Sequence, residues 1–327
     1  RQMCIRDRLY PNEHFYVITE PMKDLPTNLP VLRDYNNCLY LKEDAGKMLV
    51  GIFEPNAKPA FKDTGIVPEN FSFGELPDDF DHFEPYLKKS FHRLPMLENA
   101  GIRKFFSGPE SFTPDTQYLL GETPEIKNFF TCCGFNSIGI ASSGGAGRVT
   151  AEWMINGHIN EDLFSVDIKR FQQFHSSKKF IMERVTETLG DLYGMHWPYK
   201  QHKTSRNQIT LPYHEELKKL GACFGSSGGF ERPMWYSLNG AKAEYEYSFG
   251  YQNWYPSAEY ETKNTRKNVG LFELTPFSKF DVAGENVHEE LQKLCTANIK
   301  DIEGRSTYTQ MLNEDGGIET DVTITCL

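Results

Sequence analysis

Residues 129–147 read FFTCCGFNSIGIASSGGAG, an apolar run that leads into a glycine-rich loop. An amphipathic segment, 148–156, follows, and Gly157 is placed to end it as a left-handed helix cap. The pattern predicts a strand, a glycine turn and a helix. Its five glycines allow positive φ and the close approach of a large flat ligand. A helix that starts there offers free N–H groups and a positive dipole end, which suit an anionic or electron-rich ligand edge.

A purely structural role explains these glycines about equally well. The spacing is not the dinucleotide fingerprint G-x-G-x-x-G, so the residues alone leave both interpretations open.

Length and charge limit the class of protein. The 327 residues suffice for two or more domains, and the net charge of −10 argues against nucleic acid as a main partner. The sequence contains no apolar run of about 18 residues, so no membrane span is predicted. Seven scattered cysteines without a C-x-x-C motif predict reduced, buried thiols in the cytoplasm, with neither a disulfide framework nor a zinc site.

Both ends of the chain stand apart from the rest. Residues 1–8 (RQMCIRDR) show no hydrophobic periodicity, and 3–7 match one reading frame of a common sequencing adapter. We therefore expect an artefact there and exclude it from the fold. The sequence stops at Leu327 inside a strand-like run, so we expect an internal fragment of a longer protein.

Hydrophobic periodicity predicts the elements. Residues 9–20 alternate as a strand that places His14 and Tyr16 on one face. Short strands at 38–41 and 48–53 would complete an antiparallel sheet, and Asp79 would cap a helix that ends near residue 94. The remaining expected elements are a strand at 102–106, a turn-rich connection at 108–115, a long helix at 167–189 with a break near 176–177, a polar linker at 197–211, a helix at 261–268, a strand pair at 270–282, a helix at 287–297, and a hairpin of 308–312 with 318–325.

Two groups of polar residues could carry chemistry. His14, Tyr40 and Glu54 would converge on one sheet face, where a patch of this kind could hold an amine and move a proton. The alternative is that they are ordinary sheet residues. Asp321 follows a Gly-Gly turn, where either a solvent-facing or a ligand-facing role is open. The histidines show no metal-ligand spacing, so we predict no metal site.

Several motifs in this order resemble the dimethylglycine dehydrogenase and sarcosine dehydrogenase family. The regulatory subunit of pyruvate dehydrogenase phosphatase is a non-enzymatic relative with the same layout. The motifs are FYVITEP (15–21), LPVLRD (29–34), GPESFTPD (108–115), GFNS (134–137), GG (144–145), GLFELTPFSKF (270–280) and MLN (311–313).

The resemblance implies an α+β fold with three parts. Residues 9–165 would be the C-terminal part of a D-amino-acid-oxidase-like FAD domain, built of an antiparallel sheet plus helices. Residues 166–210 would be a connecting helical region, and 211–327 the truncated start of an aminomethyltransferase-like folate-binding domain. The dinucleotide fingerprint and the histidine that carries the flavin would lie upstream, so we expect this fragment itself to be inactive.

The resemblance also assigns roles. Residues of the glycine loop would line the flavin ring; these are Gly134, Phe135, Asn136, Ser137, Ile138 and Gly139. His14 and Tyr40 would be catalytic and face the substrate amine, Glu54 would bind substrate, and Asp321 would meet the folate. Ala141 stands where related sarcosine oxidases have a lysine, so the resemblance does not imply an identical mode of carboxylate binding.

The implied activity is oxidative demethylation of a methylated amine, dimethylglycine or sarcosine. Hydride would go to FAD and the one-carbon unit to tetrahydrofolate. A regulatory protein of the same fold and a stand-alone aminomethyltransferase are the alternatives, and the mitochondrial matrix is the alternative compartment.

Overall fold

The computed structural model describes residues 8–327, in one compact unit that ends at Gly270 and a second, Leu271–Leu327. Of the segment expected to be an artefact, residues 1–7 lie outside the described residues. Arg8 is buried and pairs with Glu125 at 2.5 Å. The structure does not test whether residues 1–8 are a sequencing artefact. The expected domain limits are also untested, so both remain predictions.

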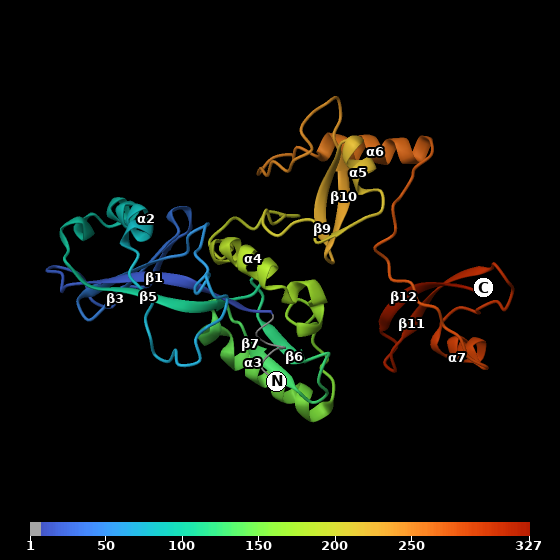
Figure 1. Ribbon diagram of the computed structural model, residues 1–327, viewed down its shortest axis with the longest axis horizontal. Helices are drawn as coiled ribbons and strands as arrows, with labels where there is room; N and C mark the ends of the chain where they lie inside the picture. Colours follow the sequence, from blue (N-terminus) through green and yellow to red (C-terminus); the bar gives the residue numbers. More distant parts are fainter. Residues whose placement is uncertain (1–7) are drawn as a thin grey trace. The chain divides into compact units, whose positions relative to one another are not determined.

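The largest sheet of the first unit is antiparallel, as predicted, but it has five strands where three were expected to form it (Figure 1). In the order β2-β3-β4-β1-β5, its strands are β2 (Leu32–Asp34), β3 (Leu39–Asp44), β4 (Lys47–Ile52), β1 (Tyr10–Thr19) and β5 (Ile102–Phe112). The expected turn-rich connection at 108–115 is wrong in its first half, because β5 pairs with β1 as far as Phe112. Pro109 is tolerated because β5 is an edge strand, where a missing N–H can face away from the ladder.

Helix α2 (Phe80–Arg93) covers one face of this sheet (Figure 1). The Asp79 carboxylate accepts a hydrogen bond from the His82 N–H at 3.1 Å, which confirms the predicted cap. The apolar residues buried between helix and sheet include Phe15, Val17, Leu39, Leu41, Val50, Ile52, Phe83 and Leu87.

Helix α4 (Lys178–Asp191) contributes to the core against the opposite face. The helix predicted over 167–189 is wrong in its first half, where the chain forms the 3₁₀ turns η3 (Ile168–Arg170) and η4 (Gln173–Ser176). The Arg170 guanidinium forms two hydrogen bonds to Asp115, at 2.7 and 3.0 Å, and this long-range pair holds η3 in place. The predicted break near 176–177 is confirmed, because α4 begins at Lys178.

The glycine stretch forms the end of a hairpin and a helix. Strand β6 (Leu119–Glu122) pairs with β7 (Phe130–Cys133), and α3 (Gly139–Asn156) follows. The helix begins earlier than its amphipathic part predicts, because burial of Ala146, Val149 and Trp153 outweighs the cost of about 1 kcal/mol per helical glycine. Gly157 ends it at φ +77°, as predicted.

The rest of the first unit is a small mixed sheet with two helices. Its elements are β8 (Ile209–Thr210), α5 (His214–Lys219), β9 (Ala222–Ser227), β10 (Phe230–Tyr236) and α6 (Tyr255–Lys267). The polar segment 197–208 carries no regular element. Helix α6 is longer than predicted and begins with Pro256 in its first turn, a position that tolerates the missing N–H.

The second unit contains the predicted hairpin of β11 (Ser306–Leu312) and β12 (Ile318–Thr325), preceded by α7 (Val287–Leu294). The strand pair expected at 270–282 is wrong. These residues form no strand, and Leu271, Phe272 and Phe280 are exposed. Apolar residues form a sheet only when partner strands accept their backbone hydrogen bonds, and the described residues offer none there. The α+β class itself is confirmed.

The described cysteines are free thiols, but they are not all buried. Cys223 and Cys295 are buried, whereas Cys132 is exposed. Between residues 8 and 327, no helix is long and apolar enough to cross a membrane, and no cluster of histidine, cysteine and carboxylate side chains could hold a metal ion.

Candidate functional site

His14 of β1 and Tyr40 of β3 meet on the sheet face opposite α2. The Tyr40 hydroxyl lies 2.9 Å from His14 Nε2, and Phe53 packs against both rings at 4.9 and 5.5 Å between centroids. Two strands separate in sequence thus bring together the two residues that the sequence analysis placed on this face.

Burial affects how this pair can share a proton. Burial raises the pKa of the Tyr40 hydroxyl, so the hydroxyl keeps its proton and is able to donate a hydrogen bond to His14 Nε2. In the tautomer that accepts this bond at Nε2, the ring proton is on Nδ1. His14 Nδ1 lies 3.4 Å from Glu110 Oε2, an ion-pair distance without hydrogen-bond alignment.

Glu110 connects the histidine to the glycine loop. The Ser137 hydroxyl donates a hydrogen bond to Glu110 Oε1 at 2.5 Å. A polar chain therefore runs from Ser137 through Glu110 and His14 to Tyr40. Sequence reasoning missed Glu110 because it treated 108–115 as a connection. The available signal was period-2 alternation: Glu110 stands two residues from Gly108, which pairs with His14.

Gly51 makes the Tyr40–His14 contact possible. Tyr40 and Gly51 are direct partners across β3 and β4, and the Tyr40 ring lies over Gly51 where a Cβ would overlap it. We expect Gly51→Ala to turn the Tyr40 ring away and break its bond to His14, at a stability cost of about 1–3 kcal/mol. ¹⁵N NMR of the His14 ring should show a changed Nε2 signal.

Gly108→Ala is the matched control for that variant. Its Cβ would meet the Phe106 ring at 2.7 Å on the same sheet face, so it strains a neighbouring aromatic residue without touching the polar chain. The His14 signal should stay as in the original chain. Equal signal changes in both variants would contradict the role given to Gly51.

The glycine loop has the backbone geometry that the sequence indicated. Gly134, Asn136 and Ser137 have positive φ values of 69, 49 and 65°. The buried Asn136 carboxamide accepts from the Thr113 N–H at 2.8 Å and donates to the Gly134 carbonyl at 2.7 Å, which fixes the loop. Phe135 stacks on Tyr118 at 4.9 Å. These two side chains thus hold the loop itself, and contact of the loop residues with a flavin stays a prediction.

The start of α3 is open on the side away from its buried residues. Ile138 caps the helix without a side-chain hydrogen bond, and Ile140 is exposed. A Cβ at Gly144 or Gly147 would meet nothing within 4 Å. The N–H groups of the first turn and these glycines, which carry no side chain, are compatible with a large, flat, electron-rich group such as a flavin ring.

Glu54 has another hydrogen-bond partner, and Asp321 belongs to the second unit. Glu54 is fully buried, and its Oε1 lies 3.1 Å from Nε2 of His82, whose ring packs against Phe15. Asp321 lies in the second unit and accepts a hydrogen bond from the Tyr308 hydroxyl at 3.0 Å. A substrate role for Glu54 and a folate role for Asp321 remain predictions.

Three family models match the chain in succession. They are the FAD dependent oxidoreductase over 1–153, the FAD dependent oxidoreductase central domain over 156–210, and the GCVT N-terminal domain over 213–327. In this order the matches fit an FAD oxidoreductase fused to an aminomethyltransferase-like domain. This confirms the predicted resemblance and FAD and tetrahydrofolate as the cofactors of such proteins.

Several known proteins are similar to nearly the whole of this chain. The chain is 41% identical to 4-methylaminobutanoate oxidase (formaldehyde-forming) of Paenarthrobacter nicotinovorans over 98% of the chain and 38% of that protein. It is 34% identical to the mitochondrial pyruvate dehydrogenase phosphatase regulatory subunit of Mus musculus over 97% and 36%. It is 32% identical to the mitochondrial sarcosine dehydrogenase of Homo sapiens over 100% and 38%. The chain thus spans less than two fifths of these relatives.

Proposed function

We propose that this chain forms the amine-binding side of an FAD-dependent oxidoreductase that demethylates an N-methylated amino acid and passes the one-carbon unit to tetrahydrofolate. The Ser137–Glu110–His14–Tyr40 chain supports it, because it joins the loop that fits a flavin to a sheet face that can move a proton. A bound flavin would supply hydride acceptance.

The protein's own residues would prepare the amine. Only a neutral amine has the free electron pair that drives loss of hydride from its methyl group. The Tyr40 oxygen can accept the ammonium proton while the hydroxyl passes its own proton to His14 Nε2. The Glu110 carboxylate beside Nδ1 stabilises the imidazolium that results.

The experiment uses the full-length flavoprotein. We expect anaerobic mixing with 4-methylaminobutanoate, sarcosine or dimethylglycine to bleach the flavin absorbance near about 450 nm with at least one amine. Tyr40→Phe should slow the bleaching by about 10²–10⁴-fold, since proton transfer is lost. Unchanged absorbance with all three amines would overturn the proposal.

That negative result would favour a second candidate, a regulatory protein like the relative from Mus musculus. We also propose dimethylglycine or sarcosine as the substrate. We expect the isolated chain neither to bind flavin tightly nor to be active. A purified chain that is yellow would contradict the last point. We propose the cytoplasm as the compartment, with the mitochondrial matrix as the alternative because two relatives are mitochondrial.

A further inference from the structure

A turn at 114–117 follows β5 and contains a strained residue. Thr116 has a φ of +62°, a left-handed conformation that a β-branched side chain rarely adopts. The Asp115 carboxylate stabilises the turn locally, because it accepts a hydrogen bond from the Gln117 N–H at 3.1 Å. Strained backbone of this kind persists only where the surrounding structure holds it in place, and it is common at functional sites.

Arg170 of η3 holds this turn on both sides of Thr116. Its guanidinium donates to both carboxylate oxygens of Asp115, at 2.7 and 3.0 Å, and to the Gln117 carbonyl at 2.8 Å. It also donates to the Asp167 carbonyl at 3.0 Å, which ties it to η3. The Arg170 side chain is only 8% exposed, so these hydrogen bonds replace the hydration that the guanidinium has lost. Only the planar fork of an arginine can bridge this many acceptors at once.

Thr113 links the turn to the glycine loop. It lies two residues before Asp115 and is fully buried. Its N–H donates to the Asn136 carboxamide oxygen at 2.8 Å, and the Asn136 amide group donates to the Thr113 hydroxyl at 3.1 Å. A Cβ on Gly134 would lie 3.2 Å from the Thr113 side chain, so the loop also packs closely against this residue. The conformation of the loop therefore depends on where Thr113 is held.

We propose that Arg170 is a positioning residue, which keeps the glycine loop in the conformation that a flavin ring needs by holding the turn at 114–117. This inference rests on the proposed function and requires no contact between Arg170 and the flavin. Arg170 lies in the stretch that matches the central domain, 156–210, whereas the loop lies in the stretch that matches the FAD dependent oxidoreductase, 1–153. The central domain would thus shape the flavin site from outside the loop.

Amide hydrogen exchange in the full-length flavoprotein, with oxidised flavin and no amine, tests this role. We expect Arg170→Gln to speed exchange in the peptide that covers 134–139 by about 10- to 100-fold, since a charge-assisted hydrogen bond is lost and the loop opens more often. The visible circular dichroism of the oxidised flavin should change in the same variant, because this signal depends on the groups around the ring.

A second substitution tests the strain at Thr116. Asparagine adopts the left-handed conformation more readily than a β-branched residue does. We expect Thr116→Asn, added to Arg170→Gln, to recover part of the slow exchange in the loop. No recovery would overturn the inference, because strain in the turn would then not be what Arg170 opposes.

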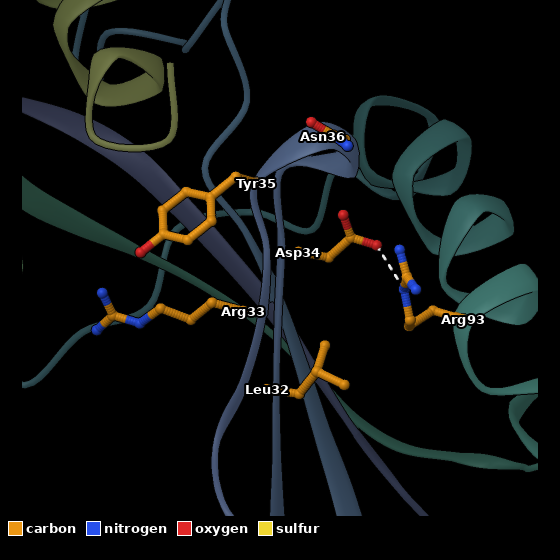
Figure 2. A pocket seen from close by; sticks show the side chains of 6 residues that line it. All are labelled: Leu32, Arg33, Asp34, Tyr35, Asn36 and Arg93. Carbon is orange, nitrogen blue, oxygen red and sulfur yellow. Dashed lines mark hydrogen bonds and ion pairs between the residues drawn. The ribbon is translucent and has the colours of Figure 1, made fainter. Parts of the chain in front are cut away.

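Arg93→Gln is the matched control. Arg93 belongs to α2 and donates to Asp34 at 2.8 Å, and Asp34 caps η1 (Tyr35–Asn37), which ends at the left-handed Cys38 with a φ of +61°. Figure 2 shows this pair at the pocket that both residues line. Both arginines therefore hold a turn through an aspartate. Urea unfolding should show a loss of stability in both variants, whereas loop exchange and the flavin signal should change only with Arg170→Gln.

The possible results separate the two proposals. Unchanged loop exchange in Arg170→Gln, or an equal change in Arg93→Gln, would overturn the positioning role while the flavin could still bleach with an amine. Faster loop exchange with an unchanged flavin signal would also overturn it, because the loop would then not shape the flavin site. Absence of bleaching with every amine in the original protein would refute the oxidoreductase and leave the role of Arg170 intact.

Discussion

Replacing His82 by leucine should destabilise the first unit by about 3–5 kcal/mol, because a buried carboxylate loses its partner. Glu54 has no exposed surface, and His82 Nε2 at 3.1 Å is its one hydrogen-bonding side chain among residues 8–327. Its second oxygen, Oε2, already lacks a partner there. Urea unfolding, extrapolated to water, measures the loss.

The double variant Glu54→Leu/His82→Leu separates this explanation from simple loss of packing. With both polar groups replaced by leucine, no charge remains buried, so most of the stability should return. A double variant as unstable as His82→Leu would show that the contact of the His82 ring with Phe15, at 5.3 Å, matters more than the ion pair.

Gly190→Ala is the second large effect, with an expected loss of about 3 kcal/mol. Alanine in a helix ordinarily stabilises by about 1 kcal/mol relative to glycine. At Gly190, however, the new Cβ would lie 2.7 Å from the Glu54 carbonyl oxygen and still closer to the Pro55 backbone. Backbone atoms cannot swing aside, so α4 must move away from the sheet.

Gly147→Ala in α3 is the control, because its Cβ meets no heavy atom within 4 Å. We expect it to stabilise by about 1 kcal/mol in the same urea titration. If both alanine variants raised the stability, or both lowered it, the contact of the new Cβ with the Glu54 and Pro55 backbone would not explain why position 190 needs a glycine.

Local patterns predicted those elements whose side chains alternate cleanly between core and solvent. Strand β1 and helix α2 show such alternation, and Asp79 marks the helix start. The η3 turn could not be predicted in this way, because it depends on Arg170 reaching Asp115, 55 residues earlier. The segment 270–282 was wrong for the opposite reason: its apolar residues fit a strand, but strand formation needs a partner.

The residues of the candidate site also divide into those that local sequence patterns predict and those that they do not. His14 and Tyr40 could be named from strand patterns and resemblance. Glu110 could not, because its position follows from the register of β5 against β1, and a shift of one residue would turn it to the other face. Gly51 matters only through the ring above it, which no sequence pattern reports.

The polar chain from Ser137 to Tyr40 has a thermodynamic consequence. If the proposed function holds, a ligand of the glycine loop that displaces Ser137 would change the contact between Glu110 and His14, and through it the hydrogen bonding of Tyr40 with a bound amine. Linkage would then require the amine to alter the affinity of the loop for its ligand by the same factor. Each of the two ligands would therefore report on whether the other is bound.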